Sequence, residues 1–182
     1  MALLDRTTSQ TSLLERFPLP SQLGLIAALG SGVLLGGAYF FQYVIGLAPC
    51  EMCLWQRWPH MAVIVAGLAA LTCYKTPRLA GGLLLVAVLG LATTAALGLF
   101  HAGVELRWWQ GPQACSGTIP TGLSPEELRK YLFSARMVRC DQVAWSLLGI
   151  SMAGWNAILS AVLAIGLASG AVRWMKAPRM TT

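Results

Sequence analysis

Four stretches of this chain carry no charged side chain, and each is long enough to cross a membrane as a helix. A helix needs roughly 20 apolar residues to span the hydrocarbon core of a bilayer. Barrel strands would be about half as long and would alternate in polarity. We therefore predict an all-α membrane protein, a four-transmembrane-helix bundle, with spans near residues 22–47, 57–74, 79–103 and 144–171.

The composition supports a membrane location. Only 11% of the 182 residues are charged, whereas 56% are hydrophobic, and a soluble domain carries about 25% charged residues. The first apolar stretch starts too far into the chain, after too acidic a tail, to be a cleaved signal peptide, so we expect it to be retained. We predict a single integral membrane domain, residues 1–182. Charges that flank the spans explain the net charge of +6. The sequence has no stripe of Lys and Arg with interleaved aromatic residues, the pattern that would indicate nucleic-acid binding.

Cysteines indicate the orientation better than charges do. Lys and Arg divide seven to six between the two sides of the membrane, so the positive-inside rule is nearly silent. The side that holds the loops 48–56 and 104–143 carries Cys50, Cys53, Cys115 and Cys140. Such a cluster suits an oxidising compartment. We expect both loops in the periplasm of a bacterium, both termini in the cytoplasm, and Cys73 at the opposite face as an inert thiol.

The second loop contains a helix start. Ser124 is a good N-cap, Pro125 suits the first helical position, and Glu127 completes a capping box. Beyond them an apolar stripe follows at helical spacing: Leu128, Tyr131, Leu132, Ala135 and Val138. This pattern predicts a short amphipathic interfacial helix lying on the bilayer surface. The alternative is a helix that packs on the first loop as ordinary core.

The first loop carries Cys50 and Cys53 as a C-x-x-C unit, with Arg57 one helical turn further on. A helix start here would stabilise a thiolate at Cys53, and the charge of Arg57 would add to this. Pro59 leaves two possible helix starts open, at Cys53 or at Trp58. A four-cysteine zinc site would need two such knuckles, and only one exists. A redox relay fits best.

A disulfide between Cys115 and Cys140 would close a loop of about 25 residues and constrain the unfolded chain by roughly 3 kcal/mol. A structural staple is therefore the alternative for this second pair. His101 ends the third span on the cysteine side, as either an ordinary interfacial residue or a functional one. GxxxG spacings at Gly32/Gly36 and Gly166/Gly170 favour packing within the bundle rather than between subunits, so we expect a monomer.

At two places the chain resembles a known family. The segments "PCEMCLWQR" and "CDQVAWSLLGISMAGWN", with a long cysteine-bearing loop between them, resemble the disulfide bond formation protein B (DsbB) family of bacterial inner-membrane thiol:quinone oxidoreductases. The resemblance extends from the first span to the fourth. It implies a membrane quinone, ubiquinone or menaquinone, as cofactor, and a thioredoxin-like periplasmic dithiol protein, DsbA-like, as partner.

The resemblance also implies a role for each candidate residue. Cys115 would form the mixed disulfide with the partner. Cys140 would then attack Cys50, and Cys53 would contact the quinone with Arg57 beside it. His101 matches a family histidine near the quinone by position only, and Gln56 stands where a family member has an acid, so no acid role is carried over. The alternatives are a membrane scaffold with purely structural disulfides and a thiol reductase that runs electrons outward.

Overall fold

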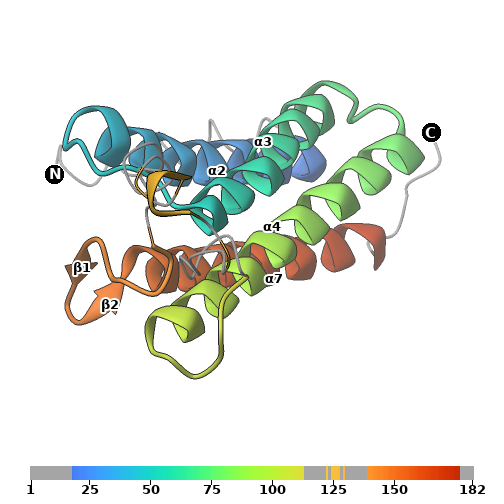
Figure 1. Ribbon diagram of the computed structural model, residues 1–182. Helices are drawn as coiled ribbons and strands as arrows, with labels where there is room; N and C mark the ends of the chain where they lie inside the picture. The colour runs from blue at the N-terminus through green and yellow to red at the C-terminus, as the bar shows by residue number, and fades with distance from the viewer. Residues whose placement is uncertain (1–17, 113–121, 123, 128, 130–138, 177–182) are drawn as a thin grey trace, which may run out of the picture.

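The computed structural model describes residues 18–112, 122, 124–127, 129 and 139–176. Four long helices form the bundle: α2 (Leu19–Tyr43), α3 (Glu51–Thr72), α4 (Pro77–Glu105) and α7 (Met152–Lys176). Each packs mainly on its neighbour along the chain, and α7 closes back on α2. The predicted all-α fold with four long helices is confirmed (Figure 1).

Three of the helices, α2, α4 and α7, are long and apolar enough to cross a membrane. The fourth, α3, is of similar length and packs between α2 and α4, but its first half holds Glu51, Arg57 and His60. Large apolar side chains point outward from the bundle; Val33, Val65 and Ile165 are each more than two-thirds exposed. An outward apolar surface is what a bilayer requires, so α3 crosses with the other three helices.

The helices α2 and α3 approach each other closely at paired glycines. A Cβ atom at Gly24 would lie 2.5 Å from the carbonyl oxygen of Gly67, and the reverse distance is the same. Of the four glycines in the predicted GxxxG pairs, Gly170 packs within the bundle, where a Cβ would lie 2.6 Å from Leu23 Cδ2. A Cβ at any of the other three would meet no described residue within 4 Å. Small residues matter where two backbones cross, and sequence spacing alone does not locate that crossing.

Two predicted boundaries need correction. Residues 51–56, predicted as loop, form the first turns of α3, because Cys50 caps the helix and Pro59 is accommodated inside it. Residues 146–151, predicted as part of the last span, form a hairpin of β1 (Ser146–Leu147) and β2 (Ile150–Ser151). Its two turn residues, Leu148 and Gly149, both have positive φ, as a type I′ turn requires.

The start of α7 explains why the last helix begins later than predicted. Ser151 Oγ accepts a hydrogen bond from the backbone N–H of Gly154 at 3.1 Å, which satisfies one of the free donors at the helix N-terminus. The indole N–H of Trp155 donates to the carbonyl of Leu147 at 3.1 Å and ties the hairpin to the helix. The hairpin, the 44–50 loop and the end of α4 all lie at one end of the bundle (Figure 1).

The capping box predicted at Ser124 is confirmed. Glu127 N–H donates to Ser124 Oγ at 3.3 Å, and the Glu127 carboxylate accepts from Ser124 N–H at 2.9 Å. The Ser124 hydroxyl also donates to the Glu127 carboxylate at 2.7 Å. This hydrogen bond, and after it the one from the Ser124 backbone, lowers the pKa of the exposed Glu127 carboxyl. Most of the predicted amphipathic interfacial helix, including all five residues of its apolar stripe, lies outside the described residues.

Candidate functional site

The C-x-x-C pair lies at the N-terminus of α3. Cys50 is the N-cap residue, with extended backbone, and its Sγ accepts a hydrogen bond from the backbone N–H of Cys53 at 3.3 Å. This geometry turns both side chains to the same side, and the two Sγ atoms lie 2.7 Å apart. A disulfide has an S–S bond of about 2.05 Å, so the pair is placed to close one with little movement.

Cys50 is the member of the pair that holds its proton. The hydrogen bond with Cys53, and after it burial, raises the pKa of the Cys50 thiol above its ordinary value. Cys50 therefore donates its S–H to Cys53, and any negative charge on the reduced pair rests on Cys53. The role of Cys53 as the thiolate that contacts a cofactor stays a prediction.

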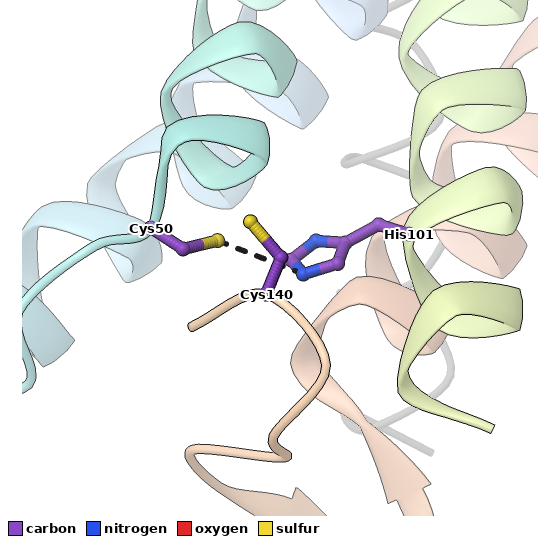
Figure 2. A group of neighbouring side chains, drawn as sticks. All are labelled: Cys50, His101 and Cys140. Carbon is purple, nitrogen blue, oxygen red and sulfur yellow. Dashed lines mark hydrogen bonds between the residues drawn. The ribbon is translucent and has the colours of Figure 1, made fainter. Parts of the chain in front are cut away.

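Cys140 comes from the segment that leads into the hairpin, and it is fully buried. Its Sγ, the Sγ of Cys50 and a ring nitrogen of His101 all lie within 4.8 Å of one another (Figure 2). Cys140 is disulfide-bonded, whereas Cys50 and Cys53 are free. Since a disulfide sulfur is not a thiolate ligand, the trio is poorly suited to a metal ion. A disulfide beside a free thiol is instead the arrangement that thiol–disulfide exchange requires.

His101 projects from the last turns of α4 into the same cluster. Its Nε2 lies 3.6 Å from Cys50 Sγ, and its Nδ1 lies 3.0 Å from the side-chain nitrogen of Gln56. The carboxylate of Glu105, one turn further along α4, lies 3.9 Å from Nε2. The histidine therefore contacts the cysteine pair on one edge of its ring and α3 on the other.

Arg57 is buried between α3 and α2. Its Nη1 donates to Gln42 Oε1 at 2.6 Å, and its guanidinium carbon lies 4.8 Å from the centre of the Tyr39 ring. The Nε of Arg57 is also buried, yet it has no hydrogen-bond partner among the described residues. A buried donor without an acceptor is costly, so a ligand oxygen placed there would be stabilised.

These residues meet at one open pocket with a volume of about 410 Å³. This volume falls in the range of small-molecule sites, about 300–1,000 Å³. Its wall is mostly apolar, with residues from all four helices and from the segment around Cys140. The polar side chains on the wall include Gln42, Cys50, Cys53, Gln56, Arg57, His60, His101, Glu105 and Asn156.

Four of the six predicted site residues line this pocket: Cys50, Cys53, Arg57 and His101. Cys140 lies beside Cys50 without lining the pocket, and Cys115 lies outside the described residues. Cys73 caps the far end of α3, away from the cluster. The sequence-based prediction gives no site role to five polar residues of the wall: Gln42, Gln56, His60, Glu105 and Asn156. A signal for most of them exists in the sequence, because amide and ionisable side chains are rare within apolar spans.

Known proteins are similar to this chain in sequence over most of its length. The family model described as disulfide bond formation protein DsbB matches residues 20–169. Disulfide bond formation protein B of Polaromonas naphthalenivorans is 34% identical over 80% of this chain and 87% of its own length. Disulfide bond formation protein B 2 of Pseudomonas aeruginosa is 30% identical over 79% of this chain and 88% of its own.

An uncharacterized protein of Rickettsia prowazekii is also similar, at 30% identity over 80% of this chain and 84% of its own length. No solved structure gives a significant match. The distances between the site residues described above are therefore information that the sequence similarity does not provide.

Proposed function

Because the chain belongs to the DsbB family of disulfide bond formation proteins, we propose that it is a protein-dithiol:quinone oxidoreductase of the bacterial inner membrane. Family membership implies a role in disulfide bond formation, and the chain is a multi-pass membrane protein. In the proposed path, electrons enter from a thioredoxin-like periplasmic dithiol protein, DsbA-like, at the Cys115/Cys140 pair. They pass to the Cys50/Cys53 pair and leave to a membrane quinone.

One observation carries this proposal: a disulfide-bonded sulfur, that of Cys140, lies within 4.8 Å of the free sulfur of Cys50. Five cysteines are present in the chain, and we assign Cys115 as the disulfide partner of Cys140. Two neighbouring pairs can exchange a disulfide without a diffusing carrier. A purely structural staple would not require a second, free pair of cysteines beside it.

The exchange steps balance as follows. The partner's thiolate attacks Cys115, a partner–Cys115 bond forms, the Cys115–Cys140 bond breaks, and Cys140 leaves as a thiolate. Cys140 then attacks Cys50 in the oxidised C-x-x-C pair, so that a Cys140–Cys50 bond forms and Cys53 leaves as a thiolate. The helix N-terminus at Cys53 and the cation of Arg57 favour negative charge at that position.

The pocket fits a quinone ring. It is largely apolar, its volume suits a small ring system, and the buried Nε of Arg57 is a donor for which the described part of the chain offers no acceptor. Carbonyl oxygens of a quinone are acceptors, so Arg57 would hold the ring, with Cys53 and His101 on the same wall. When bound, a quinone supplies an acceptor for two electrons and two protons that remains in the bilayer.

Single-serine variants expressed with a thioredoxin-like periplasmic protein test the path. In Cys140→Ser, Cys115 has no intramolecular partner and its thiolate attacks the disulfide of the oxidised thioredoxin-like protein, so we expect a stable adduct on a non-reducing gel. In Cys115→Ser we expect no such adduct. Cys73→Ser is the matched control and should behave as the unchanged protein.

Two outcomes of this experiment would contradict the proposal. Adducts that persist in Cys115→Ser and vanish in Cys140→Ser would reverse the two roles. Full oxidation of the partner by a variant lacking both Cys115 and Cys140 would exclude the relay and leave the loop disulfide as a structural staple.

A further inference from the structure

A line of buried and half-buried polar side chains leads from Cys50 into the middle of the bundle. His101 Nε2 lies 3.6 Å from Cys50 Sγ, and Gln56 Nε2 lies 3.0 Å from His101 Nδ1. Asn156 continues the line with Nδ2 at 2.7 Å from Gln56 Oε1, and its Oδ1 lies 2.9 Å from His60 Nε2. His60 Nδ1 ends it, 3.2 Å from Ser31 Oγ. We call these six residues the polar chain.

Contacts outside the polar chain fix the orientation of both amides. Gln56 Nε2 also lies 3.1 Å from the carbonyl oxygen of Met52, which can only accept a hydrogen bond. Thr94 Oγ1 donates its one proton to the carbonyl of Gln56 at 3.2 Å, so it accepts from Asn156 Nδ2 at 3.1 Å. These contacts therefore identify the donor nitrogen of each amide as Nε2 of Gln56 and Nδ2 of Asn156.

The orientation of the amides determines where both histidines carry their proton. Since Gln56 Nε2 can only donate, His101 Nδ1 must accept, and the proton of the neutral ring lies on Nε2, toward Cys50. Asn156 Oδ1 can only accept, so His60 carries its proton on Nε2, and its Nδ1 accepts from the hydroxyl of Ser31. Every donor in the polar chain thus points toward Cys50.

Resting on the proposed function, we propose that Gln56, Asn156 and His60 are positioning residues that hold His101 in the tautomer with its proton on Nε2. In this form His101 donates a hydrogen bond to the sulfur of Cys50 and cannot accept a proton from it at that nitrogen. The role differs from that of a general base. It also differs from a proton wire, because an amide in the line donates through its N–H without passing the proton on.

The proposed donor acts when Cys50 leaves. The partner's second thiolate first displaces Cys115 from the mixed disulfide, so that the partner leaves oxidised and Cys115 becomes a thiolate. In the resolving step this thiolate attacks Cys140, a Cys115–Cys140 bond forms, the Cys140–Cys50 bond breaks, and Cys50 departs with the electron pair as a thiolate. Two donors face that sulfur, the Nε2–H of His101 and the backbone N–H of Cys53. Donors already in place stabilise the charge as it develops, without reorganisation.

The charged and titratable groups around His101 come from three elements. Glu105 faces Nε2 from the same helix, at 3.9 Å, and Arg57 lines the same pocket from α3. Cys50 and Cys53 face the ring from the start of α3, and Arg139 lies on the pocket wall beside the disulfide-bonded Cys140. Glu105 accepts hydrogen bonds when ionised, so it too favours a proton on Nε2.

The direct test is ¹⁵N NMR of the purified full chain with ¹⁵N-labelled histidine rings. The affinity tag contains no histidine, so that only the histidines of the chain give signals. The chain has two histidines, and His60→Gln leaves His101 as the only imidazole, which assigns both signals. We expect both rings to be neutral at pH 7 with the proton on Nε2. A His101 ring protonated on Nδ1 would overturn the proposal, and this reading needs neither quinone nor partner.

Variants then separate positioning from general structure. Gln56→Leu removes the donor to Nδ1, so we expect the His101 proton to divide between the two nitrogens. Breakage of the Cys140–Cys50 bond, followed by acid quench and peptide mass analysis, should slow about tenfold or more, since a hydrogen bond to a charged group is lost. Thr93→Val, on an exposed face of α4, is the matched control and should change neither reading.

The two proposals fail separately. A Nε2 tautomer that persists unchanged in Gln56→Leu would contradict the positioning role and leave the electron path intact. A Nε2 tautomer in a protein that oxidises no dithiol partner would support the positioning role and contradict the proposed function.

Discussion

The two halves of α3 bury one continuous helix face with opposite chemistry. The first half, residues 51–60, buries Met52, Gln56, Arg57 and His60. The second half, residues 61–72, buries Val63, Ala66, Gly67 and Ala70. The spacing of three to four residues continues without a break, so the change of chemistry is not a change of helix orientation.

The polar residues of the first half of α3 indicate a role beyond helix packing. Polar groups within a membrane are expensive and persist where they are paired or needed. Gln56 and His60 are fully hydrogen-bonded inside the bundle, and the exception is Arg57 Nε. In the second half, Gly67 meets Gly24 backbone to backbone. One half of α3 therefore carries the candidate site, and the other holds the helices together.

The largest effect is expected in the polar half, from Arg57→Ala. This change removes the buried donor that faces the pocket, so quinone reduction should slow by about 100-fold, the loss typical of a donor that stabilises developing charge. Arg57→Lys should recover part of the rate, because the charge remains but the planar fork does not. The measurement is quinol formation at saturating reduced partner.

Arg173→Ala, in the last turn of α7, provides the control for Arg57→Ala and should leave the rate unchanged. Equal rates for Arg57→Ala and the unchanged protein would remove Arg57 from the site and erase the contrast between the halves.

A smaller effect, of a different kind, is expected in the apolar half from Gly67→Ala. Its Cβ would lie 2.5 Å from the carbonyl oxygen of Gly24, and overpacking of this kind lowers the free energy of unfolding by about 1–3 kcal/mol. Denaturant unfolding in detergent micelles measures it. The rate of quinone reduction per folded molecule should not change, because the site lies in the other half.

Gly82→Ala on α4 is the matched substitution, since a Cβ there would meet none of the described residues within 4 Å. Replacing a helical glycine without a clash should raise stability by roughly 0.5–1 kcal/mol. If Gly67→Ala and Gly82→Ala changed stability in the same direction, the close approach of α2 and α3 would not limit the packing.

Local patterns in the sequence account for much of the fold. Uncharged stretches indicate the four long helices, and the capping box at Ser124 and Glu127 is present as predicted. The hairpin at residues 146–151 was not predicted, because an uncharged run of "SLLGIS" reads as part of a span. Its two positive-φ residues, Leu148 and Gly149, are a property of the backbone that hydropathy does not report.

The candidate site was only partly accessible from sequence. The spacing of the C-x-x-C unit, with Arg57 one helical turn after Cys53, is recognisable in the sequence. The pairing of Gln56 with Asn156, which lie 100 residues apart, depends on how α3 and α7 meet. No local sequence pattern encodes the contact between α3 and α7, so the sequence alone does not predict the polar chain.

The central claim is that electrons reach a quinone through both cysteine pairs. The most direct measurement is an anaerobic assay with the purified full chain, reduced thioredoxin-like partner and ubiquinone, in which quinol is followed by absorbance and partner disulfide by mass. The account predicts one quinol for each partner disulfide, with both products lost in Cys53→Ser and in Cys140→Ser. Partner oxidation without quinol, or quinol formation that survives Cys140→Ser at the full rate, would contradict it.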